Sequence, residues 1–419
     1  MGRFLVVVPP LVGHTNPTVP VGRELVHRGH TVAWAGHPEV IADLLPPGAP
    51  FLPVADAVPQ AIVDATNARL EKRTGGIGGF ASLWETCVLP LAHHMLPGTF
   101  AAVDGFRPDV LLVDQHALAG AAVAEARGLP WATSATTSAD LVDPIEALPK
   151  VAAWLRDQMA GVLRAAGVAP ERAAAVDPRF SPHLLLAFTV PDLVGPVGSL
   201  PDHYALVGPS FGDRPADPSF PWDWLGDPGD GRPNVLVSLG TLNWKTGERF
   251  FTVVAEAFRG LDARAVVVAP PGLVPDPPPN VLLRSWVPQL ALLPRMDAVV
   301  CHGGHNTVCE SLAHGLPLVV AAIRDDQPII ADQVARAGAG VRVKFTRVAP
   351  AELRDALRTV LTDPGPRAAA GRLRASLEGA GGPAAAADRL EALLTRAPAS
   401  AEPASPTSPP STAPSAKGT

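Results

Sequence analysis

Near its middle the chain reads Gly212-Asp-Arg-Pro-Ala-Asp-Pro-Ser-Phe-Pro-Trp-Asp-Trp-Leu-Gly-Asp-Pro-Gly-Asp-Gly-Arg-Pro233. So much proline, glycine and aspartate can propagate neither a helix nor a central strand. A regular pattern of apolar runs and helical segments precedes this stretch, and a second one follows it. The sequence therefore predicts an interdomain linker over residues 212–233, and 419 residues are enough for two domains.

In both halves, apolar runs that suit buried strands alternate with segments of helical periodicity. Expected strands are 4–8, 31–35, 109–114, a strand that 128–133 leads into, 234–239, 265–269, 281–283, 298–301 and 318–322. Expected helices are 18–28, 118–127, 248–259, 289–294, 307–314 and 329–337. Between them, residues 54–106 are less regular and suit inserted helices and loops beside a substrate pocket.

Continuous apolar strands separated by helices predict parallel sheets covered on both faces. We therefore expect an α/β protein with two doubly wound, Rossmann-like domains, at 1–211 and 234–383, facing each other across a cleft. Leucine spacing predicts a helix over 384–396, and we expect it to pack back towards the N-terminal domain. Residues 397–419 are almost all Ala, Pro, Ser and Thr, which predicts a disordered tail.

Composition excludes several classes of protein. A hydrophobic fraction of 47% with 18% charged residues is typical of a globular chain. The net charge of -6 and the aromatic content of 5% argue against a nucleic-acid partner. Three scattered cysteines, Cys87, Cys301 and Cys309, are too few for a disulfide framework or a zinc site, which suggests a reducing compartment.

The N-terminus is basic and then apolar, as a short signal peptide is. Pro9-Pro10 interrupts the run and no small-residue cleavage site follows closely, so a buried strand fits it better. Elsewhere no stretch supplies the ~18 uninterrupted apolar residues of a transmembrane helix. We expect a cytoplasmic protein with no stable membrane insertion.

One segment has the pattern of a phosphate site. In Val300-Cys-His-Gly-Gly-His-Asn-Thr-Val-Cys-Glu310 a strand ends, two glycines make a turn and a helix opens near Thr307. Backbone N–H groups at such a helix start suit a phosphate. A plain strand-to-helix turn is the alternative, but His302, Asn306 and Thr307 add polar donors beside the turn.

Three shorter patterns accompany it. Val237-Ser-Leu-Gly-Thr241 is a strand that runs into Gly240 and a hydroxyl, which by itself is also typical of a helix cap. In Arg284-Ser-Trp-Val-Pro-Gln289, Trp286 could stack on a base or pack in the core. Adjacent acids in Arg324-Asp-Asp-Gln327 point to opposite sides of an extended segment, which argues against a metal there.

Together, Trp-x-Pro-Gln, His-Gly-Gly-x-Asn-Thr, Glu310 and Asp-Gln resemble the donor signature of the UDP-glycosyltransferase superfamily, in particular of bacterial enzymes that glycosylate macrolides, other natural products or carotenoids. The resemblance runs from about residue 3 to 396 and is strongest over 281–341. It implies the GT-B fold and a nucleotide-sugar donor. His305 departs from the family, where Trp or Met is common, and Thr307 stands where Ser is common.

The resemblance assigns each motif a part of the donor. Trp286 would stack on the nucleobase, whose edge the Val287 backbone would read. Gln289 and Glu310 would hold the ribose. Asp326 and Gln327 would bind sugar hydroxyls. The groups around the diphosphate would be His302, Gly303, Gly304, Asn306, Thr307, Ser238, Gly240 and Thr241.

The Pro9–Pro17 loop, with Gly13-His14, resembles the catalytic histidine loop of the same family. Asp114 ends a strand on the same sheet edge and matches the aspartate of its dyad, although a helix cap is the alternative and His116 is a rival histidine. His14 would act as general base and Asp114 would stabilise its imidazolium. The reaction implied is inverting, and it needs neither metal nor cofactor.

Bulky side chains in the irregular region suggest a hydrophobic acceptor, such as a polyketide, an aromatic aglycone, a sterol or a carotenoid. The candidates are Trp84, His93, Met95 and Phe100, and each could equally be a core residue. The resemblance implies a UDP- or dTDP-hexose as the donor, and the sequence does not distinguish the two bases.

Three other functions are conceivable for a chain of this fold class. A NAD-dependent oxidoreductase would need Gly-x-Gly-x-x-Gly after the first strand, where this chain has Leu-Val-Gly-His-Thr-Asn-Pro17. A nucleotide-sugar epimerase of the same fold and a non-catalytic partner of another transferase remain alternatives.

Overall fold

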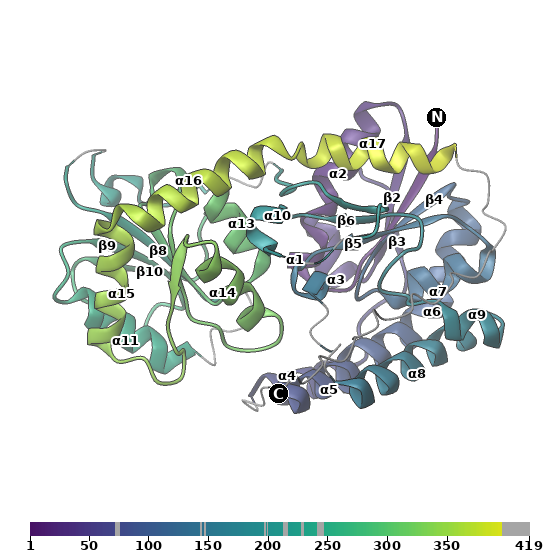
Figure 1. Cartoon of the computed structure of the whole chain (residues 1–419), viewed down its shortest axis with the longest axis horizontal. Helices are drawn as coiled ribbons and strands as arrows, with labels where there is room; N and C mark the ends of the chain where they lie inside the picture. The colour runs from purple at the N-terminus through teal and green to yellow at the C-terminus, as the bar shows by residue number, and fades with distance from the viewer. Residues whose placement is uncertain are drawn as a thin grey trace, which may run out of the picture.

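The protein consists of two lobes, each built around a parallel sheet (Figure 1). A computed structural model describes residues 1–71, 76–142, 145, 148–196, 198, 200–212, 217–227, 230–240 and 247–395. Thr241 and the predicted tail, 397–419, lie outside the described residues. The predicted fold class, α/β with two doubly wound sheets, is confirmed.

The N-terminal lobe has seven strands in the order β3-β2-β1-β4-β5-β6-β7. They are β1 Arg3–Val7, β2 Thr31–Gly36, β3 Phe51–Pro53, β4 Val110–Asp114, β5 Trp131–Ala135, β6 Leu185–Ala187 and β7 Tyr204–Leu206. Its helices are α1 Val12–Thr15, α2 Thr18–His27, α3 Pro38–Ile41, α4 Gln60–Glu71, α5 Gly76–Leu83, α6 Leu89–Phe106, α7 Leu118–Arg127, α8 Pro149–Ala165, α9 Pro170–Ala175 and α10 Pro191–Val194.

The C-terminal lobe has six strands in the order β10-β9-β8-β11-β12-β13. They are β8 Asn234–Ser238, β9 Arg264–Val268, β10 Val281–Arg284, β11 Ala298–Cys301, β12 Leu318–Val320 and β13 Gly340–Arg342. The helices that follow its strands are α11 Glu248–Phe258, α12 Gln289–Leu292, α13 His305–Ala313, α14 Gln327–Arg336, α15 Pro350–Thr362, α16 Pro364–Gly379 and α17 Gly382–Leu394.

Helices cover both faces of the N-terminal sheet. Successive side chains of its central strands point to opposite faces, and they are buried on both. Phe4 and Val6 of β1 share one core with the apolar residues of α2 and α17. Leu5 and Val7 point the other way, into a core with α6 and α7. Both sides of β1 are therefore buried, which explains its uninterrupted apolar sequence.

Strand order reverses at one point in each sheet, between β1 and β4 and between β8 and β11. At such a point the chain leaves neighbouring strands towards opposite faces, which opens a crevice at the carboxyl ends of the strands. Val7 pairs with Val113 and Cys301 pairs with Ser238. Residues just after these four positions consequently meet in the two crevices.

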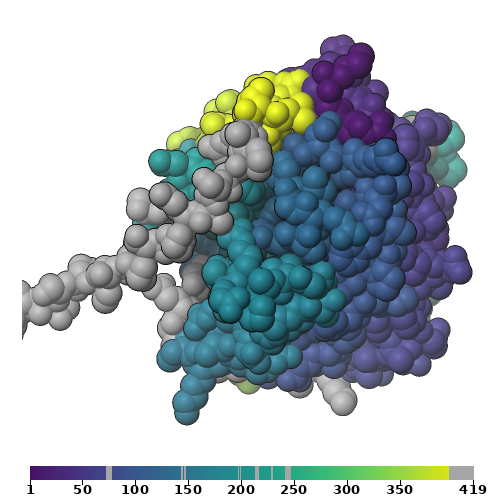
Figure 2. Space-filling view, turned by 90° about the vertical axis from the view of Figure 1, so that its right-hand side faces the viewer, coloured from purple at the N-terminus to yellow at the C-terminus, as the bar shows by residue number. Residues whose placement is uncertain are grey.

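Helix α17 crosses to the N-terminal lobe, where it lies along α2 at the top of Figure 1 and beside the first residues of the chain in Figure 2. Leu390 and Leu393 are buried there. Arg28 Nη1 donates to Glu391 Oε2 (2.8 Å), and His30 Nε2 lies 2.7 Å from Glu391 Oε1. This helix therefore joins the two ends of the chain on one lobe.

Only part of the linker stretch is described. Trp222–Leu225 forms a single 3-10 turn, and Phe220 and Leu225 are buried in the same core as Leu236 of β8 and Val299 of β11. The end of this stretch is therefore packed into the C-terminal lobe.

Several element boundaries differ from those expected. Val12–Thr15, expected as loop, forms a helical turn that carries His14. Helix α13 begins at His305, two residues before the expected start at Thr307. Gly304, whose backbone is extended (φ -63°, ψ 129°), is the N-cap residue that precedes its first turn. The amphipathic helices α8 and α15 were not expected. No helix in the described ranges has the length and apolar character needed to span a membrane.

The packing of α17 predicts a stability effect. Leu390→Ala would leave a cavity beneath this helix and should lower the free energy of unfolding by about 2–5 kcal/mol. Arg389→Ala removes an exposed neighbour and should change it by no more than about 0.5 kcal/mol. Urea denaturation followed by circular dichroism measures both, and equal values for the two variants would contradict the packing described here.

Candidate active site

His14 and Asp114 meet in the crevice between β1 and β4. The Nδ1 atom of His14 lies 3.0 Å from Oδ1 and 2.9 Å from Oδ2 of Asp114. The Asp114 side chain is fully buried, whereas 20% of the His14 side chain is exposed. Because Nδ1–H donates to the carboxylate, Nε2 is the ring nitrogen left to accept a proton.

Two further groups hold the Asp114 carboxylate in place. The backbone N–H of His116 donates to Oδ1 (2.9 Å) and the Thr136 hydroxyl donates to Oδ2 (3.2 Å). Thr136 Oγ1 also lies 2.9 Å from His14 Nδ1. Sequence reasoning missed Thr136, although the hydroxyl-rich end of a strand paired with β4 was a usable signal.

These contacts set the charge of the two histidines. Burial by itself lowers the pKa of His14, but the charge and hydrogen bond of Asp114 raise it above its ordinary value of 6.5, with help from Asp326 and Asp140. Burial and the His14 charge lower the pKa of His116 to about 4, so its ring is neutral. The centroid of the His116 ring lies 5.1 Å from that of the His14 ring. The Asp114 carboxylate is hydrogen-bonded to the ring of His14.

His14, Asp114 and His116 place potential metal-ligand atoms within 4.8 Å of one another. The Asp114 oxygens and His14 Nδ1 already bond each other, and the raised pKa of His14 follows from that bond. This pairing is the arrangement of a general base and its orienting carboxylate.

On the facing lobe, glycines shape the turn between β11 and α13. Gly303 has φ 88°, and a side chain on Gly304 would meet His302 Nε2 at 2.6 Å. Gly240 has φ 74°, and a side chain there would meet Cε1 of the same imidazole at 2.8 Å. His302 Nδ1 is buried with no hydrogen-bond partner among the described residues, and burial lowers its pKa to about 4. The turn therefore presents a neutral polar ring beside free helix N–H groups.

Residues predicted to surround the diphosphate come together here. Ser238 ends β8 directly beside Cys301 of β11, and Asn306 and Thr307 lie in the first turn of α13. The Asn306 amide donates across the cleft to the Gly13 carbonyl (2.7 Å). This bond places the start of α13 next to the turn that carries His14.

The predicted base and ribose groups lie at the next strand ends. Trp286 follows β10 and is 53% exposed, so it is available for stacking, while Val287 beside it is buried. The Gln289 amide donates to Glu310 Oε2 (2.5 Å), and Glu310 is almost fully buried. Two residues 21 positions apart therefore form one polar pair.

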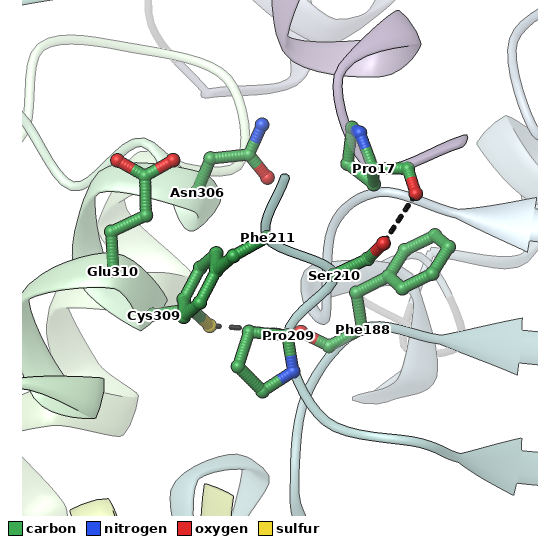
Figure 3. A pocket seen from close by; sticks show the side chains of 8 residues that line it. All are labelled: Pro17, Phe188, Pro209, Ser210, Phe211, Asn306, Cys309 and Glu310. Carbon is green, nitrogen blue, oxygen red and sulfur yellow. Dashed lines mark hydrogen bonds between the residues drawn. The ribbon is translucent and has the colours of Figure 1, made fainter. Parts of the chain in front are cut away.

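A pocket adjoins this pair on the side of the N-terminal lobe (Figure 3). Its lining residues are Pro17, Phe188, Pro209, Ser210, Phe211, Asn306, Cys309 and Glu310. The Ser210 hydroxyl donates to the Pro17 carbonyl (2.6 Å), which fixes the segment after β7 against the start of α2. Asn306 and Glu310, which are predicted to bind the diphosphate and the ribose, therefore line a pocket together with side chains of the N-terminal lobe.

Asp326 and Gln327 start α14, opposite the end of β5. Thr137, the residue after Thr136, donates its hydroxyl to Asp326 Oδ2 (2.7 Å). Burial raises the pKa of Asp326 to about 6. Gln327 Oε1 accepts from the N–H groups of Ile323 (3.0 Å) and Arg324 (3.1 Å), which fixes the orientation of its amide.

The predicted acceptor residues do not form one group. Trp84 is buried, and its ring lies edge-on to the His116 ring, with 6.2 Å between the ring centroids. It therefore packs against a neighbour of the His14–Asp114 pair. His93 is exposed. Met95 is fully buried in the core between the sheet and α6, so its predicted acceptor contact has no support in the packing of this side chain.

Phe100, also predicted to contact the acceptor, packs against α7. Its ring lies 4.6 Å below the Arg127 guanidinium, at the C-terminal end of α7. Since α7 starts near Asp114 and runs back along the sheet, its end lies at the opposite edge from the catalytic pair. His305, singled out as a family departure, is buried at the lobe interface with Nε2 3.2 Å from the Phe188 carbonyl.

Comparisons with known proteins agree with this geometry. Residues 254–393 match the family model for the C-terminal domain of erythromycin biosynthesis protein CIII-like proteins. The chain is 33% identical to 4'-demethylrebeccamycin synthase of Lentzea aerocolonigenes, over 89% of this chain and 94% of that protein. It is 32% identical to demethyllactenocin mycarosyltransferase of Streptomyces fradiae, over 95% of this chain and 87% of that protein.

A solved structure agrees as well. Spinosyn rhamnosyltransferase SpnG complexed with thymidine diphosphate superposes with a TM-score of 0.69 at 26% identity, covering 93% of this chain and 100% of that one. The chain therefore belongs to the bacterial nucleotide-sugar glycosyltransferases of the erythromycin CIII-like, natural-product family, which have the GT-B fold.

Proposed function

We propose that this enzyme moves a hexose from UDP or dTDP to a hydroxyl group of a hydrophobic natural product, with inversion and without a metal. The observation that carries the proposal is the hydrogen bond from Asn306 to the Gly13 carbonyl. It brings the helix start that suits a diphosphate next to a histidine paired with a buried carboxylate. A sugar held between them would have its leaving group on one side and the base on the other.

His14 performs the proton transfer. An alcohol is a weak nucleophile at neutral pH, so Nε2 removes its proton as the oxygen attacks the anomeric carbon. The new imidazolium is stabilised by the Asp114 carboxylate, which accepts hydrogen bonds from two N–H donors and the Thr136 hydroxyl. A single displacement of this kind inverts the anomeric configuration.

The leaving diphosphate is stabilised on the C-terminal lobe. Its developing charge meets the N–H groups at the start of α13, together with Ser238 and His302. Trp286 and the Gln289–Glu310 pair would bind the nucleoside, while Asp326 and Gln327 would bind sugar hydroxyls. The thymidine diphosphate bound to the spinosyn relative supports a dTDP sugar, and UDP is the alternative donor.

Replacing the base should separate catalysis from binding. His14→Ala should lower turnover by about 100- to 10,000-fold, because it removes the base proposed to take the acceptor proton. Binding of UDP or dTDP should persist. His27→Ala removes an exposed histidine of α2 and should keep wild-type turnover. Nucleotide release is followed with EDTA present over a panel of aromatic and polyketide acceptors, and near-normal turnover by His14→Ala would refute the assignment.

The pH dependence should report the Asp114 contact. Only neutral His14 accepts a proton, so kcat/KM should fall as the pH drops through a pKa that lies above 6.5. Asp114→Asn removes the charge that favours the imidazolium and should move this fall about 1–3 pH units lower. Asp104→Asn removes an exposed acid from α6 and should leave the profile in place. An unmoved profile for Asp114→Asn would contradict the coupling.

Base stacking predicts a binding effect. Trp286→Ala should weaken binding of UDP and dTDP by about 1–3 kcal/mol, since an aromatic side chain contributes that much per stacked base. Val26→Ala changes an equally exposed apolar residue, also 53% accessible, and should have no effect. Thermal-shift titration measures the dissociation constants, and unchanged nucleotide binding by Trp286→Ala would exclude the stacking role.

A further inference from the structure

Helix α4 of the N-terminal lobe contacts the loop that precedes α14 of the C-terminal lobe. The Arg69 guanidinium forms an ion pair with Asp325 Oδ1. Beside this pair, Arg324 Nη1 donates to the Leu70 carbonyl (3.0 Å). We call this set of residues, Arg69, Leu70, Arg324 and Asp325, the α4 latch.

The latch is largely shielded from water. Only 6% of the Arg69 side chain and 26% of the Asp325 side chain are exposed. An ion pair in such a place is weakly screened, and removing one partner leaves the other charge poorly solvated. By contrast, the Arg127–Asp104 pair of the same lobe has side chains 41% and 53% exposed. Both pairs therefore join an arginine to an aspartate, and they differ in how far their side chains are exposed.

The contacted loop has an unusual backbone. Asp325 has φ 54°, in the left-handed region that residues other than glycine rarely adopt. On its far side, Gln327 Oε1 accepts the N–H groups of Ile323 and Arg324. Two sets of bonds therefore hold the loop in this conformation, one from within it and one from α4.

The next residues along the chain are the ones proposed to bind the sugar. Asp326 follows Asp325 directly and is held by Thr137 from the N-terminal lobe. Loss of the Arg69 contact would allow Asp325 to leave its left-handed conformation, and the direction of the Asp326 carboxylate would change with it. The nucleoside groups, Trp286 and the Gln289–Glu310 pair, lie on other elements and would not move.

We propose that Arg69 is a positioning residue, which acts through Asp325 to orient Asp326 and Gln327 towards the donor sugar. This inference rests on the proposed function of that pair. It assigns a role in donor binding to a helix from the irregular region of the N-terminal lobe. Through α4, the lobe expected to bind the acceptor also supports the loop expected to bind the sugar.

The test compares a sugar nucleotide with its bare nucleotide. Isothermal titration calorimetry gives dissociation constants for dTDP-glucose, dTDP, UDP-glucose and UDP with the full-length protein. In Arg69→Gln and Asp325→Asn, the dissociation constant of the sugar nucleotide should rise about tenfold while that of the nucleotide changes less than about twofold. Arg69→Lys keeps the charge and should recover part of the loss. The control, Arg127→Gln, should change neither constant.

Each outcome decides the inference. Equal weakening of sugar nucleotide and nucleotide, or no weakening in a variant with the wild-type melting temperature, overturns it. If Arg69→Gln does not fold, Asp325→Asn carries the same comparison. Wild-type protein that binds no nucleotide overturns the proposed function itself, whereas normal nucleotide binding with an unchanged sugar contribution in the variants overturns only the role of Arg69.

Discussion

Every strand pair in both sheets is parallel, and this constraint places the whole site. In a parallel sheet all carboxyl ends lie at one edge, so the segments that follow distant strands are brought together. His14 follows β1 and Asp114 ends β4, 100 residues later, yet their side chains bond directly. The same rule joins Ser238 with the turn after β11.

Burial decides how these groups behave chemically. A carboxylate without solvent contact, such as Asp114, is costly unless every oxygen is bonded, and three separate segments supply its donors. The charge and hydrogen bond of Asp114 raise the pKa of His14, whereas burial is the main cause that lowers the pKa of His116 and of His302. Histidines in one cleft thus differ in pKa because the Asp114 carboxylate is hydrogen-bonded to the His14 ring.

Contacts between the lobes bring the two crevices into register. Asn306 contacts Gly13, Thr137 contacts Asp326, and the α4 latch joins the same two lobes. Helix α17 returns to the first lobe and is anchored by Leu390. Because several of these bonds use side chains proposed to bind the donor, closure of the lobes and donor binding involve the same residues.

Local sequence determined many of the elements and their type. Apolar runs such as Phe4–Val7 became buried strands, and the motifs from Trp286 to Gln327 already contained the residues proposed to bind the donor. Tertiary structure decided which polar groups meet. Thr136 and Arg69 carry no motif, since their partners lie 22 and 256 residues away. Bulk and apolarity alone likewise could not distinguish core from pocket, as Met95 shows, because only the packing of the helices determines which side of a helix is covered.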